Sequence, residues 1–497
     1  MFSTKESLIS DSNLAHQKVT SEAHNSLAVS DSPDERRLRT KIDLHIVPIV
    51  SILYLFAFID RANIGNAKIA GLDKDLGMTG YDYNVIISTF YIGYIVFEVP
   101  AIVLCKWIGP GWFLPATSVL FGICSVGTAF VTTVPQACVV RFLLGIFEAG
   151  MMPGTTYYLS RWYRRSELTF RLSLYLVTAP LAGAFGGLLA SGILRLSHFG
   201  GLTSWRMIFA IEGILTIGLS LVALLTLTDR PETARWLTVE EKTLAVARVR
   251  SERVTAQVLL DSMTMRKFFR GIANPVTLSV GIVFLFDAIT VQAMAFFLPT
   301  VVKTIYPEYD TVQQQLYTAP PYVVGAFMVV FLSYLSWRTD RRQIFFILTA
   351  PVVMAGYIMF LASKEQRVRY GATFLVASSF TLGTLTNSQV SANVISDTSR
   401  SGAIAFNSMC AHLGGLVGTW AFLPWDGPHY PIGNGLNLAT SGMILVISSL
   451  TLFWMNWDNR ARDKRVAERG DADESLGLTQ QEVEDLDWRH PAFRWKP

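Results

Sequence analysis

Long apolar segments follow one another along most of the chain and are separated by short polar turns. A helix of about 20 apolar residues crosses a hydrocarbon core about 30 Å thick, and twelve segments approach that length. The first six are predicted at 42–63, 84–105, 113–132, 137–158, 172–194 and 206–227. The second six are predicted at 275–299, 318–337, 343–362, 370–390, 402–423 and 438–457. This pattern predicts an all-α membrane protein with 12 transmembrane helices.

A long polar insert divides these segments into two groups of six. The predicted parts are a cytosolic tail (1–40), an N-terminal six-helix bundle (41–228), a cytosolic linker (229–270), a C-terminal six-helix bundle (271–457) and a second cytosolic tail (458–497). The first tail is rich in Ser, Asp and Glu and lacks the apolar core of a signal peptide, so we expect it to be disordered. Two six-helix bundles joined by a linker are typical of transporters that contain a pseudo-repeat.

Basic residues indicate the orientation of the helices. Lys and Arg gather in the segments on one side, which are 36–41, 161–165, 229–270, 338–342 and 460–465. On the other side, Lys68 and Lys74 are offset by acids. The positive-inside rule therefore predicts a multi-pass protein with both termini in the cytosol, and we expect the plasma membrane as its location.

Composition supports the membrane class and excludes others. Of 497 residues, 51% are apolar and 16% are charged, whereas a soluble domain has about 25% charged residues. The net charge of +4 is too small to indicate a nucleic-acid partner. The four cysteines form no CxxC pair, so neither a disulfide framework, a metal site nor another cofactor is predicted. No HExxH or GxSxG motif lies in a predicted helix, which argues against an enzyme.

The fourth predicted helix carries two charges, Arg141 and Glu148. Seven residues are close to two helical turns, so both side chains lie on one face about 10 Å apart. A charge in hydrocarbon costs about 2.5–3.5 kcal/mol on the insertion scale, so both must face a paired or wet interior. Gly145 between them leaves room for a neighbouring helix or a ligand. Two interpretations are open: a structural ion pair, or a binding and proton-relay site.

Several motifs resemble those of the major facilitator superfamily. The loop 337–342 (WRTDRR) and its counterpart 106–112 (KWIGPGW) resemble the short charged loops of that superfamily, and Arg141-x3-Gly145-x3-Ala149-Gly150 resembles its fourth-helix motif. The resemblance implies the major facilitator fold with a cytosolic gate at Asp340, Arg341 and Arg342. Simple positive-inside anchoring is the alternative for the two arginines, and the first loop lacks the acid of the family pattern.

Four further stretches are similar to the anion:cation symporter family and its fungal allantoate and nicotinate permease branch. They are 59–65 (IDRANIG), 148–163 (EAGMMPGTTYYLSRWY), 205–213 (WRMIFAIEG) and 297–300 (FLPT). The resemblance implies that Arg61 and Arg141 meet a substrate carboxylate and that Asn407 contacts the substrate from the other bundle. It also implies that Asp60 and Glu148 take up protons.

The predicted depths of these side chains agree with such a mechanism. Asp60 and Arg141 fall near the same membrane boundary, so an Asp60–Arg141 pair is feasible. Protonation of Asp60 would free Arg141 for an anion, which links the two binding events. Glu148 falls near the middle of the membrane, where burial favours its neutral form and suits it to carry a proton.

Other polar residues in the predicted helices have two readings each. Glu98 is either a second proton site or a partner near Lys106, and His412 is taken as a satisfied interior histidine. The remaining candidates either line a cavity or simply join and pack helices; they are Asp287, Gln292, Asn387, Ser388, Gln389, Asn393, Tyr91, Tyr94 and Tyr175.

The sequence thus predicts a secondary active transporter that takes up a small organic anion with a proton by alternating access. The best substrate prediction is a nicotinate- or allantoate-like compound. Export of a secondary-metabolite acid and a nutrient receptor without transport are the alternatives. We expect a monomer whose partners are the anion, the proton and the lipid bilayer, with no nucleic acid and no cofactor.

Overall fold

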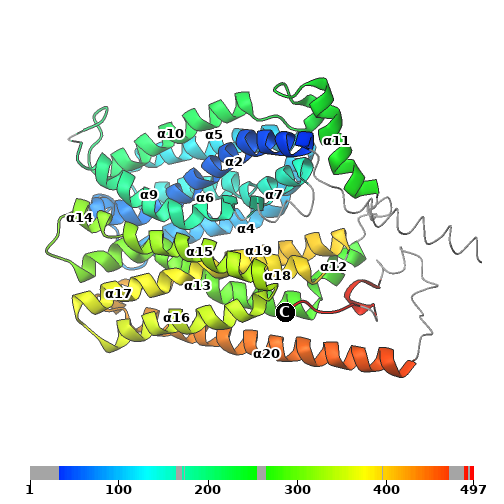
Figure 1. Ribbon diagram of the computed structural model, residues 1–497. Helices are drawn as coiled ribbons and strands as arrows, with labels where there is room; N and C mark the ends of the chain where they lie inside the picture. Colours follow the sequence, from blue (N-terminus) through cyan, green and yellow to red (C-terminus); the bar gives the residue numbers. More distant parts are fainter. Residues whose placement is uncertain are drawn as a thin grey trace, which may run out of the picture.

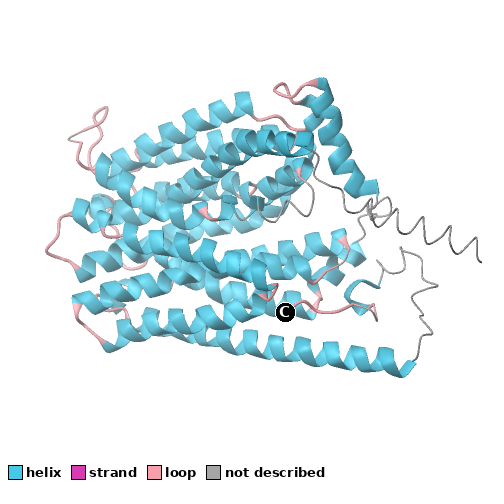
Figure 2. Cartoon of the chain, in the orientation of Figure 1, coloured by secondary structure: helices cyan, strands magenta, loops and turns pink. Residues whose placement is uncertain are grey.

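The computed structural model describes residues 33–163, 171–172, 174–196, 198–254, 265–394, 396–469, 486–490 and 493–497. Within these ranges the secondary structure is helical apart from one isolated bridge between Phe199 and Leu202, as Figure 2 shows. This confirms the predicted all-α class. Most of the predicted N-terminal tail, residues 1–32, lies outside the described residues.

The helices of the N-terminal half match the first six predicted segments. They are α2 (Pro33–Ala67), the π-helical turn η1 (Lys68–Leu72), α3 (Asp73–Asp75), α4 (Asp82–Ile108), α5 (Pro110–Thr128), α6 (Val134–Glu148), α7 (Met151–Trp162), α9 (Thr178–Ile193) and α10 (Trp205–Thr226). Helix α2 begins within the predicted tail 1–40. The predicted linker contains η2 (Pro231–Thr233) and α11 (Val239–Val254), and α12 (Met265–Ile272) crosses its predicted end.

The C-terminal half repeats the arrangement with different interruptions. Its helices are α13 (Pro275–Ile305), α14 (Thr311–Leu316), α15 (Ala319–Thr339), α16 (Arg342–Ala362), α17 (Gln366–Val376), η3 (Ala377–Ser379), α18 (Phe380–Ala392), α19 (Asp397–Gly418), η4 (Pro424–Asp426) and α20 (Pro431–Arg469). A short helical turn, η6 (Asp487–Arg489), precedes the end of the chain.

Ten helical stretches among the described residues are long and apolar enough to cross a membrane. The tenth and eleventh predicted segments are not among them, although both are helical and pack with the other helices. The tenth is divided into α17, η3 and α18, none of which reaches membrane-spanning length, and α19 starts with a polar stretch, 396–401. Together with the ten, these two complete the twelve predicted positions.

The helices form two groups that lie side by side, as Figure 1 shows. Helices α2, α4, α5, α6, α7, α9 and α10 pack with one another, and α13 and α15–α20 form the other group. The groups meet along the helix pairs α2–α13, α4–α19, α9–α15 and α9–α14, which we call the bundle seam. Helix α2 begins and α20 ends at the same end of the molecule, on the right in Figure 1; we call this the termini end and the opposite one the far end.

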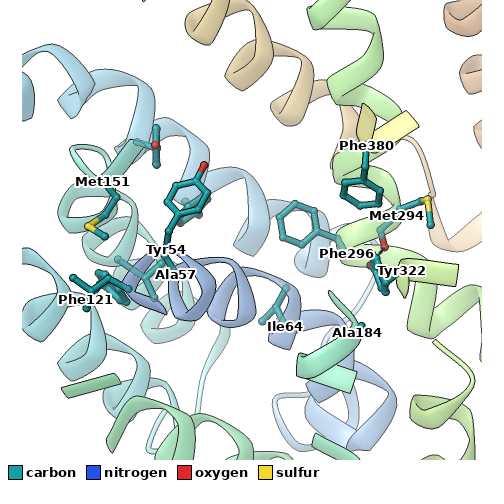
Figure 3. Packing of buried hydrophobic residues seen from close by; sticks show 14 of the residues in the cluster. Tyr54, Ala57, Ile64, Phe121, Met151, Ala184, Met294, Phe296, Tyr322 and Phe380 are labelled. Atoms are coloured by element: carbon teal, nitrogen blue, oxygen red, sulfur yellow. Dashed lines mark hydrogen bonds between the residues drawn. The ribbon is translucent and has the colours of Figure 1, made fainter. Parts of the chain in front are cut away.

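The largest apolar cluster continues across the bundle seam. Figure 3 shows Ile64 and Ala184 from the N-terminal half in the same cluster as Phe296 and Tyr322 from the C-terminal half. All four side chains are buried. The two bundles are therefore in direct contact through packed side chains at this level.

Hydrogen bonds join the bundles at the far end. Tyr83 at the start of α4 donates to the Phe296 carbonyl oxygen over 3.1 Å, and Ser88 lies 3.1 Å from the Thr419 hydroxyl. Gln315 donates to the Asn66 carbonyl oxygen over 3.3 Å. The structure therefore represents a state in which the far end of the seam is closed.

The last five described residues, 493–497, bind to the termini end of the C-terminal bundle. Trp495 is 2% exposed and packs among aromatic rings that include Trp454. Its indole N–H donates to Asp458 of α20 over 2.7 Å. The backbone of Lys496 exchanges hydrogen bonds with Asn393 at the end of α18, and Pro497 accepts one from the N–H of Arg342. This segment thus ties α16, α18 and α20 together.

Candidate functional site

The fourth predicted helix is divided where its charged face ends. Helix α6 begins at Val134, after Thr133, whose hydroxyl caps the N–H of Gln136, and it ends at Glu148. A turn at 149–150 precedes α7. Both Arg141 and Glu148 are buried, at 3% and 1% exposure, and both contact α2, Arg141 through the Asp60 carbonyl oxygen and Glu148 through Arg61. The predicted common face is present.

Arg61 and Glu148 form a buried ion pair between α2 and α6. The Arg61 Nε donates to Glu148 Oε1 over 2.7 Å, while Glu148 Oε2 has no hydrogen-bond partner among the described residues. The guanidinium is surrounded by rings, with its central carbon 4.7 Å from the Phe58 centroid, 5.1 Å from Phe90 and 5.0 Å from Tyr94. Aromatic faces attract a cation, so this cage holds Arg61 in place.

Arg141 is close to its predicted partner but does not pair with its carboxylate. Its Nη1 lies 3.4 Å from the backbone carbonyl oxygen of Asp60, and its guanidinium lies over the Phe209 ring. The Asp60 carboxylate instead accepts a hydrogen bond from Ser125 of α5 over 2.5 Å. Consecutive residues on a helix point about 100° apart, so Asp60 faces α5 while Arg61 faces α6. The expected Asp60–Arg141 ion pair is corrected accordingly.

Arg141 keeps free hydrogen-bonding capacity in the interior. Among the described residues, neither its Nε nor its Nη2 has a hydrogen-bond partner. A buried guanidinium with unfilled donors carries a large desolvation cost unless an anion or water meets it. Arg141 is therefore the group in this region best placed to receive an acceptor from outside the protein.

Both arginines line one small cavity at the bundle seam. Its volume is about 10 Å³, room for about one water molecule, and it is lined by Arg61, Ile64, Ile87, Phe90, Arg141 and Phe296. Phe296 belongs to α13, so the cavity is bounded by both bundles. The C-terminal bundle has a second, larger cavity of about 30 Å³ near Tyr357 and Phe422, and its lining is almost entirely apolar.

Asn407 lies apart from this cavity in the described contacts. It is fully buried in α19, and its Nδ2 donates to the Asn387 Oδ1 of α18 over 3.0 Å. Its own Oδ1 has no hydrogen-bond partner among the described residues, and no hydrogen bond in the described part of the chain joins it to Arg61 or Arg141. A substrate contact from Asn407 stays a prediction.

The predicted gate residues occupy the turn between α15 and α16. Asp340 has a left-handed backbone (φ 50°) and ends α15, which makes the reversal possible. Arg342 lies 3.2 Å from the Asp340 carboxylate and donates from its Nε to the Ser388 hydroxyl over 2.8 Å. Arg341 precedes α16, and the gating role of all three stays a prediction.

The acid missing from the first charged loop is supplied from elsewhere in the chain. Asp229, which follows α10, accepts a hydrogen bond from the N–H of Gly111 over 3.2 Å. The same carboxylate pairs with Arg161 of α7 over 2.7 Å. A carboxylate therefore stands beside this turn although the loop 106–112 contains none.

Three further buried acids, Glu98, Glu212 and Asp287, lie outside the predicted site. Glu98 lies 3.3 Å from His412 of α19, across the seam, rather than beside Lys106. Glu212 and Asp287 have no hydrogen-bond partner for either carboxylate oxygen among the described residues. For Glu212, its place in the motif 205–213 was the available signal; a contact between residues 98 and 412 has no local signature.

Two six-helix bundles that enclose buried ionisable groups at their seam define a membrane carrier rather than an enzyme. Comparison of the sequence with known families matches residues 50–419 to the Major Facilitator Superfamily. The chain belongs to this superfamily and is a membrane transporter.

The curated relatives found by sequence comparison are fungal transporters. The chain is 32% identical over 452 residues to the uncharacterized transporter C1039.04 of Schizosaccharomyces pombe, covering 90% of this chain and 87% of the relative. It is 32% identical over 413 residues to the MFS transporter prlL of a fungal species, covering 81% and 83%. These names give the transporter class and no substrate.

Solved structures agree on the fold. The partially occluded, inward-open xylose transporter XylE from E. coli superposes with a TM-score of 0.65 at 16% identity, covering 82% of this chain and 97% of that one. An inward-facing bacterial homologue of the human lysosomal transporter Spinster gives a TM-score of 0.61 at 16% identity, covering 83% and 95%. The predicted major facilitator fold is thereby confirmed.

Proposed function

We propose that this transporter carries a small organic carboxylate together with a proton, by alternating exposure of the cavity between the bundles. The single observation that carries the proposal is the Arg141 side chain. It is 3% exposed, lines the seam cavity and has unfilled donors among the described residues. A neutral substrate would leave this cation uncompensated, whereas a carboxylate accepts two parallel N–H bonds from a guanidinium.

The walls of the cavity favour a substrate with a flat or apolar body. The volume of about 10 Å³ in this conformation holds about one water molecule, so the bundles must separate before a substrate enters. Two of the cavity walls are the phenyl rings of Phe90 and Phe296, which can contact a ring or hydrocarbon. A nicotinate-like acid matches these features better than the ureido acid allantoate, which has no ring.

Glu148 is the proposed proton carrier. Its pairing with Arg61 gives the carboxylate a counter-charge in the empty site, and its second oxygen has no hydrogen-bond partner among the described residues. If the substrate carboxylate takes over Arg61, the buried Glu148 loses its counter-charge and binds a proton instead. Substrate and proton binding then favour one another, which is the linkage that symport requires. Asp60, held by Ser125, is the second proposed proton site.

The state of the seam supports alternating access. Hydrogen bonds close the far end in this conformation, which leaves the termini end as the proposed side for exchange of substrate. The basic loops predict cytosolic termini, and in that orientation this conformation corresponds to the inward-facing side of the transport cycle, from which substrate leaves the carrier during uptake.

The test is uptake into proteoliposomes with nicotinate, allantoate, benzoate and, as a neutral comparison, nicotinamide. We expect concentrative uptake of at least one acid under an inward proton gradient, and little uptake of the amide. Uptake that is independent of the proton gradient would overturn the proposed symport. Equal uptake of nicotinamide would overturn the proposal that the substrate is an anion. Uptake of the acid only under an outward proton gradient would favour the exporter.

Two variants and one control test the roles of Arg141 and Glu148. Arg141→Gln should abolish uptake of the acid, because the substrate charge loses its partner. Glu148→Gln should retain binding but lose the dependence on the proton gradient. Arg195→Gln, at an exposed arginine after α9, is the matched control and should behave like the unaltered protein. An unchanged pH dependence in Glu148→Gln would contradict the relay role.

A further inference from the structure

Glu98 and His412 meet across the bundle seam. The His412 Nδ1 lies 3.3 Å from Glu98 Oε2, and the two side chains are 8% and 11% exposed. Glu98 lies on α4 in the N-terminal bundle and His412 on α19 in the C-terminal bundle. This is an ion-pair distance, so the contact is attractive whenever the imidazole is protonated.

This contact is an ion-pair contact rather than a hydrogen bond, and it lies deeper along α4 than the described hydrogen bonds that join Asn84 and Ser88 to Thr419 at the end of α19. Ser88 and Thr419 meet near the far end, and Glu98 is ten residues beyond Ser88 toward the termini end. At 1.5 Å per residue, the separation along α4 is about 15 Å. The Glu98–His412 contact is therefore placed where the seam passes from its closed far end to the termini end.

Tyr94 connects this contact to the proposed substrate site. Its ring centroid lies 4.3 Å from that of His412, and the Arg61 guanidinium lies 5.0 Å from the same ring centroid. Arg61 in turn holds Glu148. The contacts therefore form an unbroken series, from Glu148 through Arg61 and Tyr94 to His412 and Glu98.

We propose that Tyr94, His412 and Glu98 are positioning residues that transmit the charge state of the Arg61–Glu148 pair to the opposite bundle. When Glu148 releases Arg61, the guanidinium is free to shift over the Tyr94 ring. A movement of the ring then changes the space available to the His412 side chain. The Glu98–His412 contact then stabilises one relative position of the bundles more than the other. The inference rests on the proposed function only in its use of Arg61 and Glu148 as the coupled site.

The alternative is a purely structural contact. A polar pair in a membrane interior can do no more than hold two helices together. That role predicts a loss of stability on substitution but no influence on how the seam responds to Glu148. The experiment must therefore measure this response rather than stability or activity alone.

The test measures the distance between the bundles by electron paramagnetic resonance, in nanodiscs and without substrate. Spin labels are placed at two exposed positions of the termini end, Trp107 at the end of α4 and Met265 at the start of α12, after the four native cysteines are replaced by serine. The effect of Glu148→Gln on the populations of open and closed termini ends is recorded in three backgrounds: unaltered, His412→Ala and Ser88→Ala.

In the unaltered background we expect Glu148→Gln to change the ratio of the two populations at least about fivefold, the lower limit of typical coupling between sites. In His412→Ala that response should disappear. It should persist in Ser88→Ala, which removes a seam contact from the same helix without touching Tyr94. Glu98→Gln should reproduce His412→Ala.

Three results would overturn the proposal, and they differ in whether the proton role of Glu148 survives. A full response in His412→Ala would leave the proton role of Glu148 intact and remove the positioning role. No response in the unaltered background would remove both, because Glu148 would then have no influence on the seam. Loss of the response in Ser88→Ala as well would assign it to seam contacts in general, which also contradicts the proposal.

Discussion

At the scale of single residues, the two buried arginines of the site differ in the groups that surround them. Arg61 has an acid and three aromatic rings around it, whereas Arg141 has a carbonyl oxygen and the ring of Phe209. The first is therefore held in the empty protein, and the second is available. This division of roles supports a carrier in which Arg141 offers its free donors to the substrate carboxylate, and Arg61 exchanges Glu148 for that carboxylate when Glu148 binds a proton.

Loss of Glu148 should destabilise the protein because it leaves Arg61 buried without a counter-charge. We expect Glu148→Ala to cost about 3–5 kcal/mol, the usual effect of breaking a buried pair. Thermal unfolding in detergent measures it. The control is Glu308→Ala, an exposed acid near the far end, which should leave the unfolding temperature within error. Equal effects of the two substitutions would contradict the ion pair's structural role.

Part of this site was predictable from the sequence, and part was not. Helical periodicity placed Arg141 and Glu148 on one buried face, and the structure has them there. Periodicity does not say which of two nearby acids an arginine will meet, since this depends on how α2 is rotated against α5 and α6. Ser125 carries no signal in the sequence that would mark it as the partner of Asp60.

At the scale of helices, close approach depends on glycines rather than on matched apolar surfaces. A Cβ at Gly145 of α6 would collide with the Phe90 carbonyl oxygen of α4, and one at Gly93 of α4 would lie 2.6 Å from the Phe142 oxygen of α6. The two helices thus fit together through reciprocal glycines. This contact also sets the distance between Arg61's cage and the face that carries Arg141.

Gly145→Ala should therefore separate α4 from α6. We expect destabilisation of about 1–3 kcal/mol, the usual cost of overpacking. Gly218→Ala in α10 is the control, because a Cβ there meets no atom within 4 Å. Alanine raises helix propensity by about 1 kcal/mol relative to glycine, so this control should be neutral or slightly more stable. Thermal unfolding of both variants measures these effects. An unchanged unfolding temperature in Gly145→Ala would contradict the described packing.

Trp495 should be necessary for the attachment of segment 493–497. Trp495→Ala removes a buried aromatic side chain, which typically costs about 3–5 kcal/mol, and should make the segment accessible to protease. Trp457→Ala, at a 59% exposed tryptophan of α20, is the control and should leave the cleavage rate unchanged. Equal cleavage of the two variants would show that the segment is not held by Trp495.

The sequence predicted the positions of the helices better than the breaks within them. Apolar length located all the spans, but it did not reveal the turn between α6 and α7 or the division of the tenth span at 377–379. Both interruptions are only two or three residues long, too short to change the mean hydropathy over the length of a membrane span. The helices α2 and α20 extend beyond their predicted limits because their charged ends continue as helix outside the apolar part.

At the scale of the whole molecule, the seam has one closed end, and small residues make that closure possible. A Cβ at Gly183 of α9 would lie 2.5 Å from the Tyr322 ring of α15, and one at Gly187 would lie 2.5 Å from the Thr318 hydroxyl. The two bundles touch at these points only because no side chain intervenes. Alternating access requires that such contacts form and break as the bundles change position.

A large side chain at Gly183 should prevent closure of the far end. We expect Gly183→Leu to shift the protein toward the state with a closed termini end, which shortens the distance between labels at Trp107 and Met265. Gly192→Leu, on the same helix with no atom within 4 Å of its Cβ, should leave the distances unchanged. An unshifted Gly183→Leu would mean that this contact does not determine which end is closed.

The attachment of the last five residues has a practical consequence for work with this transporter. A fluorescent protein or affinity tag joined directly to Pro497 would be placed against the N–H of Arg342 and the end of α18, on the rim that the gate prediction concerns. Such a fusion would alter the very surface whose motion is to be measured. Reporters belong ahead of α2 instead, at the opposite terminus of the chain.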